Sequence, residues 1–283
     1  MTTIIDGKKI RDGILEGVKS GVEALPFQPV FCDVLVGSNP ESAQYVRMKA
    51  RMAEAMGIHF HNAHFPEDIT TEKLMEEVHK LKDVPHMCGI IIQLPLPAHL
   101  DKDRILDSIE SDIDVDCLGK KASDVFYNES IEIGYPTALS CMTILDSLNL
   151  DLKGKKIVVV GQGQLVGRPV THLLQIRGLE VEIVTRHTEN KDEIIKSADV
   201  IISGTGAGKH ITGDKIKQGA VIIDAGTSES NGSIVGDVDL ESVQDIASFV
   251  SPVPGGVGPV TVSILLANVL KVAQKKANES KSI

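Results

Sequence analysis

The sequence predicts an α/β protein with two domains, each built from alternating strands and helices. Apolar runs of four to seven residues alternate with amphipathic stretches along most of the 283-residue chain, which is typical of strand–helix–strand units and parallel sheets. A glycine-rich segment follows one buried run near the middle of the chain, where a helix is expected to begin. Hydrophobic residues make up 42% of the sequence, enough for real cores in two modest domains.

A first series of elements occupies the N-terminal half. Apolar residues at every fourth position from Ile10 to Val22 predict a first helix with one buried face. Asn39-Pro40 predicts the start of the next helix, because Pro is favoured in a first helical turn. The strands are expected over 30–37, 58–65 and 88–93, and the two later helices over 40–56 and 71–82.

A second series begins at Lys155. Its strands are expected over 157–160, 181–185, 200–203 and 220–224, with helical patterns between them. The segment 116–136, which joins the two series, has weak periodicity. A last amphipathic helix is expected over 261–276.

Charge and hydropathy narrow the class of partner and the compartment. The net charge of −10 disfavours a nucleic-acid or anionic-membrane partner. The N-terminus lacks the apolar stretch of a signal peptide, and no apolar run approaches the roughly 20 residues of a membrane span. We therefore expect a soluble, cytoplasmic protein.

Neither the cysteines nor the histidines predict a metal site. The four cysteines are scattered without the spacing of zinc ligands, and we interpret them as free thiols in a reducing compartment. His59, His61 and His64 lie close together, but within a predicted strand and without an acidic or cysteine partner nearby. We interpret them as edge-strand or solvent-facing histidines, and no metal is expected.

The segment KKIVVVGQGQLVGRP has the pattern of a dinucleotide-binding loop. Gly161 and Gly163 follow a buried strand and allow the backbone to turn tightly and approach a pyrophosphate. Gly167 permits close helix–strand packing, and the N-terminus of the next helix offers free N–H groups to the anion. The spacing is one residue longer than the commonest fingerprint, but the surrounding strand and helix pattern predicts dinucleotide binding.

The end of the next strand predicts the choice of dinucleotide. NAD-binding domains usually place Asp or Glu there, whereas a basic residue suits the 2′-phosphate of NADP. Here the strand is followed by Arg186, and the first acid is Glu189. NADP is therefore favoured, and NAD stays possible.

Polar residues in the first series form a second pattern. Ser42, Tyr45 and Lys49 fall at i, i+3 and i+7 of the predicted helix and share one face. Taken alone, this pattern is more typical of a surface helix with a long lysine side chain. Gln93 ends a strand between Ile92 and Leu94, where an amide is unexpected without a partner.

Two further segments are unusual in composition. Asp112, Asp114 and Asp116 alternate with apolar residues, which alone is typical of a solvated loop. The segment 251–261, SPVPGGVGPVT, is a dense Pro/Gly loop before a helix. Its glycines would let a flat ligand lie close to the backbone.

Together these segments resemble the bifunctional methylenetetrahydrofolate dehydrogenase/methenyltetrahydrofolate cyclohydrolase family. The resemblance covers essentially the whole chain in the right order. It rests on VGSNPESAQYVRMK, GIIIQLPLP, DIDVD, VVVGQGQLVGRP, GAVIIDAGT, GDVD and PVPGGVGPVT. The last of these, with the Ser-x-x-Tyr-x-x-x-Lys helix, is the most specific.

The resemblance implies a set of catalytic and folate-binding residues. Lys49 would assist attack of water on the methenyl bridge, and Gln93 would orient Lys49. Tyr45 would stack along the pterin and aminobenzoate, and Asp116 would hold the pterin ring nitrogens. The family's folate pocket would be lined by Gly255, Gly256, Val257, Gly258 and Pro259.

The resemblance also implies the cofactor contacts and the domain organisation. Gly161, Gln162, Gly163 and Thr227 would contact NADP, in addition to the 2′-phosphate contact that the position of Arg186 predicts. Residues 1–137 and 262–283 would form a folate-binding catalytic domain to which the last helix returns, and 138–261 a Rossmann-type domain. The family is usually homodimeric. The expected reactions are the NADP-dependent oxidation of 5,10-methylenetetrahydrofolate and hydrolysis of the methenyl product to 10-formyltetrahydrofolate, a one-carbon donor for purine biosynthesis.

The chain departs from the family pattern near the expected domain junction. Cys117 stands where the family usually has Gly, and Thr137 to Leu139 replace Cys-Thr-Pro. The segment KKASDVFYN is hard to align with the usual Asn-x-Gly-x-Leu. Gln162-Gly163 replaces an Arg-Ser pair, which removes one candidate phosphate ligand. These changes bear on cofactor preference and the pocket wall more than on the reaction class.

Three other functions fit parts of the sequence. A shikimate or methanopterin dehydrogenase would share the glycine loop but has no reason to combine Tyr45, Lys49, Gln93 and Asp116. A monofunctional methylenetetrahydrofolate dehydrogenase would not need both Lys49 and Gln93. A non-catalytic folate or nucleotide binder would keep most of the same residues and differ only in turnover.

Overall fold

The chain divides into two compact units. The computed structural model describes residues 1–230 and 232–280. Unit 1 comprises Met1–Gly13 and Tyr135–Ile264, and unit 2 comprises Ile14–Gly134 and the chain from Leu265 onward. Each unit has its own parallel sheet, so the two-domain α/β prediction is confirmed.

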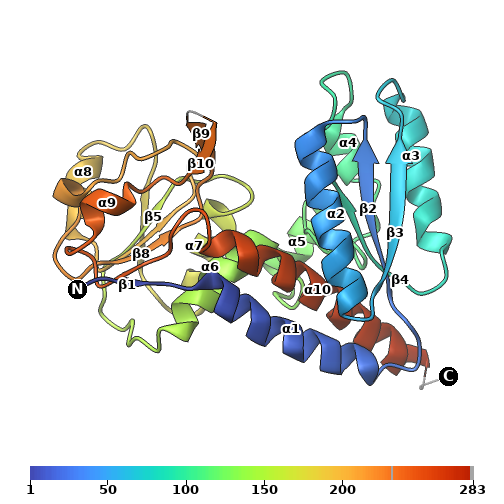
Figure 1. Cartoon of the computed structure of the whole chain (residues 1–283), viewed down its shortest axis with the longest axis horizontal. Coiled ribbons are helices and arrows are strands. Elements are labelled where there is room, and N and C mark those ends of the chain that lie inside the picture. The colour runs from blue at the N-terminus through green and yellow to red at the C-terminus, as the bar shows by residue number, and fades with distance from the viewer. Residues whose placement is uncertain (231, 281–283) are drawn as a thin grey trace. The chain divides into compact units, whose positions relative to one another are not determined.

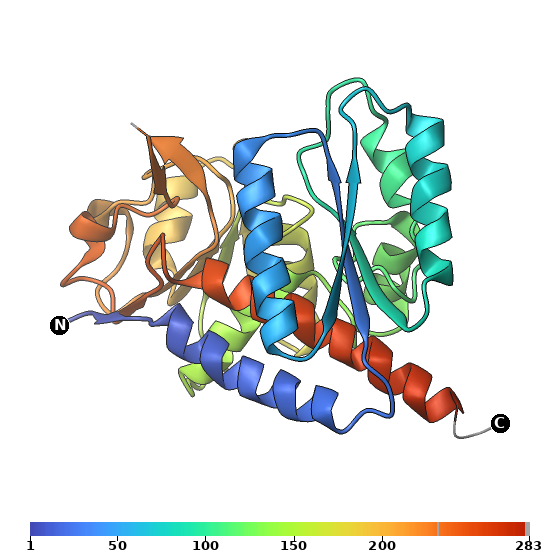
Figure 2. The same ribbon diagram turned by 45° about the vertical axis from the view of Figure 1, so that its right-hand side comes forward.

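Unit 2 is built on a three-stranded parallel sheet. The strands are β2 (Val30–Val36), β3 (His59–Phe65) and β4 (Met87–Ile92), in the order β3-β2-β4. Helix α2 (Pro40–Ala55) joins β2 to β3, and α3 (Thr71–Lys80) leads back past β2 to β4. The two connections run in opposite directions across the sheet, and both are right-handed. Helices α2 and α3 therefore lie on opposite faces of the sheet (Figures 1 and 2). Every residue of the central strand β2 is buried.

The end of the last helix packs within unit 2. Helix α10 (Val257–Ser280) places Val269 so close to Gly89 that a Cβ there would clash. The Asn268 side chain donates hydrogen bonds to the carbonyl oxygens of Val115 (3.0 Å) and Gly134 (2.9 Å). The predicted return of the last helix to the first domain is therefore confirmed. The other helices with residues in this unit are α1 (Gly7–Glu23), η1 (Leu81–Asp83), α4 (Lys102–Leu106) and α5 (Lys120–Asn128).

Helix α10 is also long and apolar enough to cross a membrane by length and composition. The most apolar stretch of the helix is, however, 61% buried inside the protein. A core helix of a soluble protein has the same properties, so this helix is weak evidence for a membrane span.

Unit 1 contains a six-stranded parallel sheet. The strand order is β1-β11-β8-β7-β5-β6. The chain runs from β5 outward to β6 and then crosses back to β7 on the other side of β5, which makes the β5/β7 pair a topological switch point. The strands are β1 (Thr3–Ile4), β5 (Ile157–Val160), β6 (Val181–Val184), β7 (Val200–Ser203), β8 (Val221–Asp224) and β11 (Phe249–Val250).

Short helices and a hairpin complete unit 1. The helices cover the sheet, whose central strands are buried along their whole length. The helices are α6 (Pro136–Ser147), α7 (Gly167–Ile176), α8 (Lys191–Ser197), η2 (Gly213–Lys215) and α9 (Leu240–Val243), and the hairpin strands are β9 (Ser228–Ser230) and β10 (Ser233–Val235).

Three features differ from the sequence-based expectation. Strand β1 pairs with β11, so residues 1–13 pack with unit 1, whereas we expected them in the folate domain. The weakly periodic segment 116–136 contains helix α5, whose buried side is only Ala122 and Phe126. Helix α10 begins at Val257 rather than 261, since a Pro in the first turn lacks only an N–H that has no helical partner.

Candidate active site

A buried lysine is the centre of the polar cluster in unit 2. Lys49 extends from α2 toward the sheet and is 7% exposed. Its Nζ donates a hydrogen bond to Oε1 of Gln93 (2.7 Å) and lies 2.6 Å from Oδ2 of Asp33. Gln93 directly follows β4, and its Nε2 donates to the carbonyl oxygen of Leu94 (2.6 Å). The amide is thereby held with its oxygen toward the lysine.

The start of α2 fixes which residues face the sheet. The Asn39 side chain accepts a hydrogen bond from the Ser42 backbone N–H (2.9 Å) and caps the helix. Ser42, Val46 and Lys49 then fall on its buried side. Tyr45 lies at the margin of this stripe and is 51% exposed. The ring of Tyr45 is therefore accessible to a ligand, whereas Lys49 is shielded.

A second carboxylate influences the lysine electrostatically. Asp116 is half-buried in the segment that follows Asp114. Burial raises the pKa of Asp116 to about 6, the Lys49 ammonium opposes this shift, and the Asp33 carboxylate adds to it. The cluster thus combines one ammonium, one amide and two carboxylates in a largely desolvated site.

Sequence reasoning missed Asp33. It lies in the middle of β2 and is 0% exposed. Burial raises the pKa of Asp33 above its usual range, and the Lys49 ammonium opposes that rise. The available signal was a charged residue inside the apolar run VFCDVLV, because a buried carboxylate is costly without a partner.

The glycine loop of unit 1 lies at the topological switch point. The Gly161 N–H donates to the Val184 carbonyl oxygen (2.8 Å), and φ at Gly161 is +91°. A Cβ there would lie 3.0 Å from the carbonyl oxygen of Gly204, which follows β7. A Cβ on Gly167 would collide with the carbonyl oxygen of Gly161, whereas one on Gly163 would meet nothing closer than 4.0 Å. These glycines form a tight loop that is open beside the N-terminus of α7.

A buried aspartate holds the neighbouring loop after β7. Oδ2 of Asp237 accepts hydrogen bonds from the Ser203 hydroxyl (2.6 Å) and the Thr205 N–H (2.7 Å), and Oδ1 accepts from the Ala207 N–H (3.0 Å). Asp224 in turn accepts a bond from the Asp237 N–H (3.1 Å). The two aspartates therefore fix the wall that faces the glycine loop, which sequence reasoning also missed.

The other residues expected at the dinucleotide lie around this region of unit 1. Arg186 is the second residue after β6 and is exposed, and its Nε donates to Nε2 of His187 (2.9 Å). Thr227 is exposed after β8. The Gln162 side chain bends back and donates to the hydroxyl of Thr171 (3.1 Å). Only the backbone of Gln162 is therefore free to approach a phosphate from this position.

Models of one family match nearly the whole chain. Residues 5–116 match the catalytic domain of tetrahydrofolate dehydrogenase/cyclohydrolase, and residues 135–277 match its NAD(P)-binding domain. The chain belongs to the tetrahydrofolate dehydrogenase/cyclohydrolase family. It is therefore an enzyme, with a dehydrogenase and a cyclohydrolase activity on tetrahydrofolate derivatives, as the sequence predicted.

Individual relatives agree with this membership. The bifunctional protein FolD of Aquifex aeolicus is 39% identical over 98% of this chain and 97% of its own length. The crystal structure of bifunctional FolD from Campylobacter jejuni has a TM-score of 0.93, at 34% identity, and covers 98% of this chain and 100% of its own. Trypanosoma brucei FolD, solved with NADP cofactor and an inhibitor, has a TM-score of 0.91 at 31% identity over 97% and 98%.

The two sites fall into the two domains of the family. Lys49, Gln93 and Asp116 lie within the matched catalytic domain, and the glycine loop lies within the NAD(P)-binding domain. The loop fits a pyrophosphate, since Gly161 makes the tight turn and the space beside Gly163 leaves room for a close approach to the backbone. The residues present therefore fit the dinucleotide that the family uses.

The departure at Cys117 has a conformational consequence. Its φ is +60°, in the left-handed region that favours glycine. The Cys117 and Gly119 N–H groups both donate to the Asp114 carboxylate, at 2.9 and 2.8 Å. Asp114 thus holds the tight turn after Asp116, and cysteine is accommodated at a cost of roughly 1–2 kcal/mol.

The segment expected to line the folate pocket is half loop and half helix. Gly255 and Gly256 precede α10, and Val257, Gly258 and Pro259 form its first turn. The Gly255 carbonyl oxygen accepts a hydrogen bond from the Gly7 N–H (3.1 Å).

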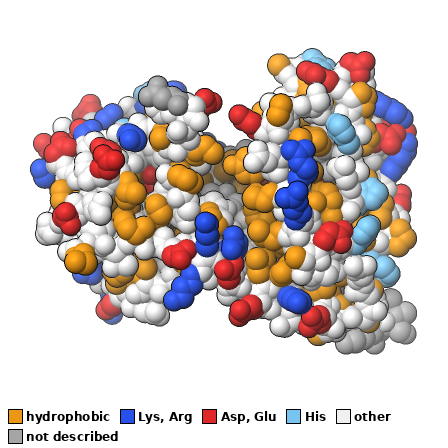
Figure 3. All heavy atoms as spheres, viewed as in Figure 1, with side chains coloured by type: hydrophobic (Ala, Val, Ile, Leu, Met, Phe, Trp, Pro, Cys, Tyr) orange, Lys and Arg blue, Asp and Glu red, His pale blue; other side chains and the backbone are white. Residues whose placement is uncertain are grey.

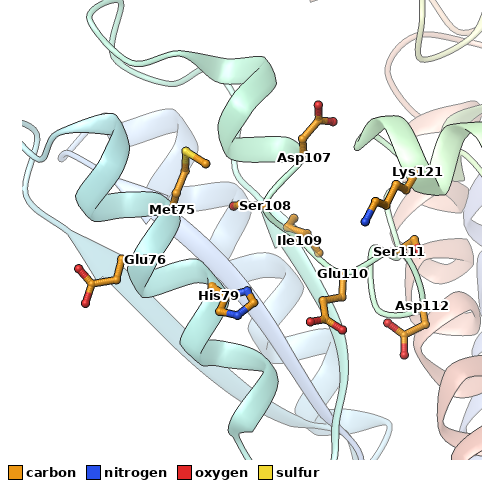
Figure 4. Close-up of a pocket in the computed structure, with 10 residues that line it drawn as sticks. All are labelled: Met75, Glu76, His79, Asp107, Ser108, Ile109, Glu110, Ser111, Asp112 and Lys121. Carbon is orange, nitrogen blue, oxygen red and sulfur yellow. The ribbon is translucent and has the colours of Figure 1, made fainter.

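A polar groove elsewhere in unit 2 is separate from the lysine cluster. It has a volume of about 640 Å³ and includes none of the predicted site residues. Figure 4 shows Glu110, Asp112 and Lys121 around it, with Glu76 pointing away. Glu110 is already paired with Lys82 (2.7 Å). Among residues 1–230 and 232–280, no three His, Cys, Asp or Glu side chains are grouped so as to hold a metal ion.

Proposed function

We propose that the chain oxidises 5,10-methylenetetrahydrofolate to the methenyl form with NADP and hydrolyses this product to 10-formyltetrahydrofolate. The observation that carries the proposal is the buried Lys49 bonded to Gln93 at 2.7 Å, in the catalytic domain of a dehydrogenase/cyclohydrolase family. NADP, when bound, accepts the hydride that leaves the methylene carbon. The glycine loop of unit 1 supports the binding of this dinucleotide.

The residues of the cluster divide the work of hydrolysis. Tyr45, with its exposed ring, stacks on the folate. The Asp116 carboxylate accepts hydrogen bonds from the pterin N–H groups. Water adds to the methenyl carbon, Lys49 takes one proton from it, and Gln93 orients Lys49. The bond from that carbon to N5 then breaks and N5 takes up a proton, which leaves the formyl group on N10. Gly255, Gly256, Val257, Gly258 and Pro259 contribute to folate binding through backbone that a side chain does not cover.

Asp116 should give folate binding a pH limit. Because burial raises its pKa to about 6, Asp116 becomes protonated as pH falls through that value and loses its ability to accept two N–H bonds. The KM for the folate should therefore rise below about pH 6, measured by initial rates from pH 5 to 8. Asp116→Asn should raise KM by about 10- to 100-fold, the value of a charged hydrogen bond, and remove this pH dependence. If the KM of the Asp116→Asn variant still rises below about pH 6 as in the wild type, Asp116 is not the group that binds the folate.

Arg186 should determine the preference for NADP. Gly161, Gln162 and Gly163 contact the pyrophosphate through backbone, Thr227 contacts the dinucleotide, and the Arg186 guanidinium binds the 2′-phosphate. Arg186→Ala should raise the KM for NADP by about 10- to 100-fold and leave that for NAD nearly unchanged. Equal losses with both cofactors would show that Arg186 does not bind the 2′-phosphate.

We also propose a cytoplasmic homodimer that supplies 10-formyl groups for purine biosynthesis. Strand β3 is an edge strand of its sheet, with one side unpaired in the described chain. Figure 3 shows histidines along the surface over β3, where His59 and His64 are exposed. A second copy would cover this edge. Measurement of the molecular mass in solution tests the dimer. The net charge of −10 gives no support to a nucleic-acid or membrane partner.

The experiment that tests the proposed reactions follows three species. Purified protein is incubated with 5,10-methylenetetrahydrofolate and either NADP⁺ or NAD⁺, and reduced nicotinamide, methenyl and 10-formyl products are measured separately. Reduced cofactor together with 10-formyl product, faster with NADP⁺, is expected. Methenyl product that decays only at its uncatalysed rate would leave a monofunctional dehydrogenase. Binding of both ligands without turnover by folded protein would leave a non-catalytic binder.

A further inference from the structure

The Asp33–Lys49 pair is the least expected feature of the lysine cluster. Asp33 is 0% exposed in the central strand, and its Oδ2 lies 2.6 Å from Lys49 Nζ. Neither oxygen of Asp33 has a hydrogen-bond partner within the described chain. The contact between Asp33 and Lys49 is an ion pair, whereas Gln93 accepts a hydrogen bond from the lysine.

This arrangement is a poor way to stabilise a strand. The free energy needed to remove two ions from water is usually about as large as their Coulombic attraction. A protein with an apolar pair of similar volume at the same place is therefore often more stable. The neighbours of Asp33 on β2 are Cys32 and Val34, both fully buried. An apolar residue at position 33 would make this buried strand more stable. The carboxylate is therefore better explained by a function than by a contribution to stability.

We propose that Asp33 is a positioning residue for the hydrolytic step. Its carboxylate holds the Lys49 ammonium beside Gln93 and sets the pH range in which Lys49 is able to take a proton from water. The inference rests on the proposed function of Lys49. Asp33 reaches the substrate only through Lys49, because it lies beneath the lysine with no exposed surface.

The charge at Asp33 acts directly on proton transfer. An ammonium beside a carboxylate resists losing its proton, since the pair would give up its attraction. Two other titratable groups face the pair electrostatically. Asp116 adds negative charge, and the Cys32 thiol stays neutral because burial raises its pKa. Removing the carboxylate of Asp33 therefore leaves Lys49 easier to deprotonate, with Gln93 still in place to orient it.

The test compares hydrolysis of methenyltetrahydrofolate by wild type, Asp33→Asn and Asp33→Val over a range of pH. Asn keeps the shape and removes the charge, and Val provides a second uncharged variant that suits a strand. The rising limb of the pH–rate profile should move to lower pH by about one unit or more in both variants. The pH profile of the dehydrogenase should not move. Asp112→Asn, which removes an exposed carboxylate from the same unit, is the matched control and should leave both profiles unchanged.

Each result separates the possibilities. A shift confined to hydrolysis, in protein with wild-type dehydrogenase activity, supports the positioning role. An unmoved profile, or a proportional loss of both activities, would show that Asp33 is structural only and would overturn the inference while the proposed function stands. Absence of hydrolysis in the wild type would instead overturn the proposed function, and this inference with it.

Discussion

Lys49→Met should reduce hydrolysis of methenyltetrahydrofolate by about 10²- to 10⁴-fold, the usual contribution of a general base. Oxidation of the methylene substrate should stay measurable, since hydride transfer depends on orientation rather than on a proton acceptor. The substitution should also destabilise the fold by about 3–5 kcal/mol, because Asp33 would be left buried without its counter-ion. Both effects are measurable, by product formation and by denaturant unfolding.

The double variant Asp33→Val/Lys49→Met separates chemistry from stability. It removes both charges together, so most of the lost stability should return. Hydrolysis should stay as low as in Lys49→Met. Wild-type hydrolysis in either variant would rule out Lys49 as the base. Recovery of hydrolysis together with stability would show that the single variant had failed through misfolding.

Gly167→Ala should abolish tight binding of the dinucleotide. The added Cβ would collide with the carbonyl oxygen of Gly161, and this neighbour is backbone that cannot rotate away. The loop must shift, and a displacement of about 1 Å is enough to cost on the order of 10²-fold in activity. The KM for NADP and the oxidation rate should change accordingly, whereas hydrolysis of added methenyl substrate, which uses no dinucleotide, should persist.

Gly163→Ala is the matched variant in the same loop. Its Cβ would meet nothing closer than 4.0 Å, so unfolding should match the wild type. Dinucleotide binding should nevertheless weaken, because the methyl group occupies the space through which a pyrophosphate approaches the backbone. Normal NADP binding by Gly167→Ala would contradict the assignment of this loop.

Much of the fold follows from local patterns in the sequence. The helix that begins after Asn39 was predicted from the proline in its first turn, and α2 has those bounds within a residue. Buried parallel strands such as β5 and β7 were equally clear from their apolar runs. The short strand β1 was not, because Thr3 and Ile4 become a strand only through pairing with β11, more than two hundred residues away in the chain.

Residues of the candidate site could be singled out from the sequence where helical spacing or a motif marked them. Lys49 lies on the buried side of α2 and Tyr45 at the margin of that side. Gln93 was marked by an amide at a strand end that needed a partner, and the structure supplies Lys49 as that partner. Asp33 was not predicted, because its pairing depends on the packing of α2 onto β2. The roles of Asp237 and Asp224 were likewise hidden, since they bond backbone groups from loops distant in sequence.

The most direct test of the account is hydrolysis without a dinucleotide. Wild-type protein is mixed with methenyltetrahydrofolate in the absence of NADP, and 10-formyl product is measured against the uncatalysed reaction at the same pH. If the Lys49 cluster is a hydrolytic centre, product should form at least about 10²-fold faster than without protein, and Lys49→Met should remove this excess. Formation at the uncatalysed rate by folded protein would contradict the central claim that this cluster catalyses the second reaction.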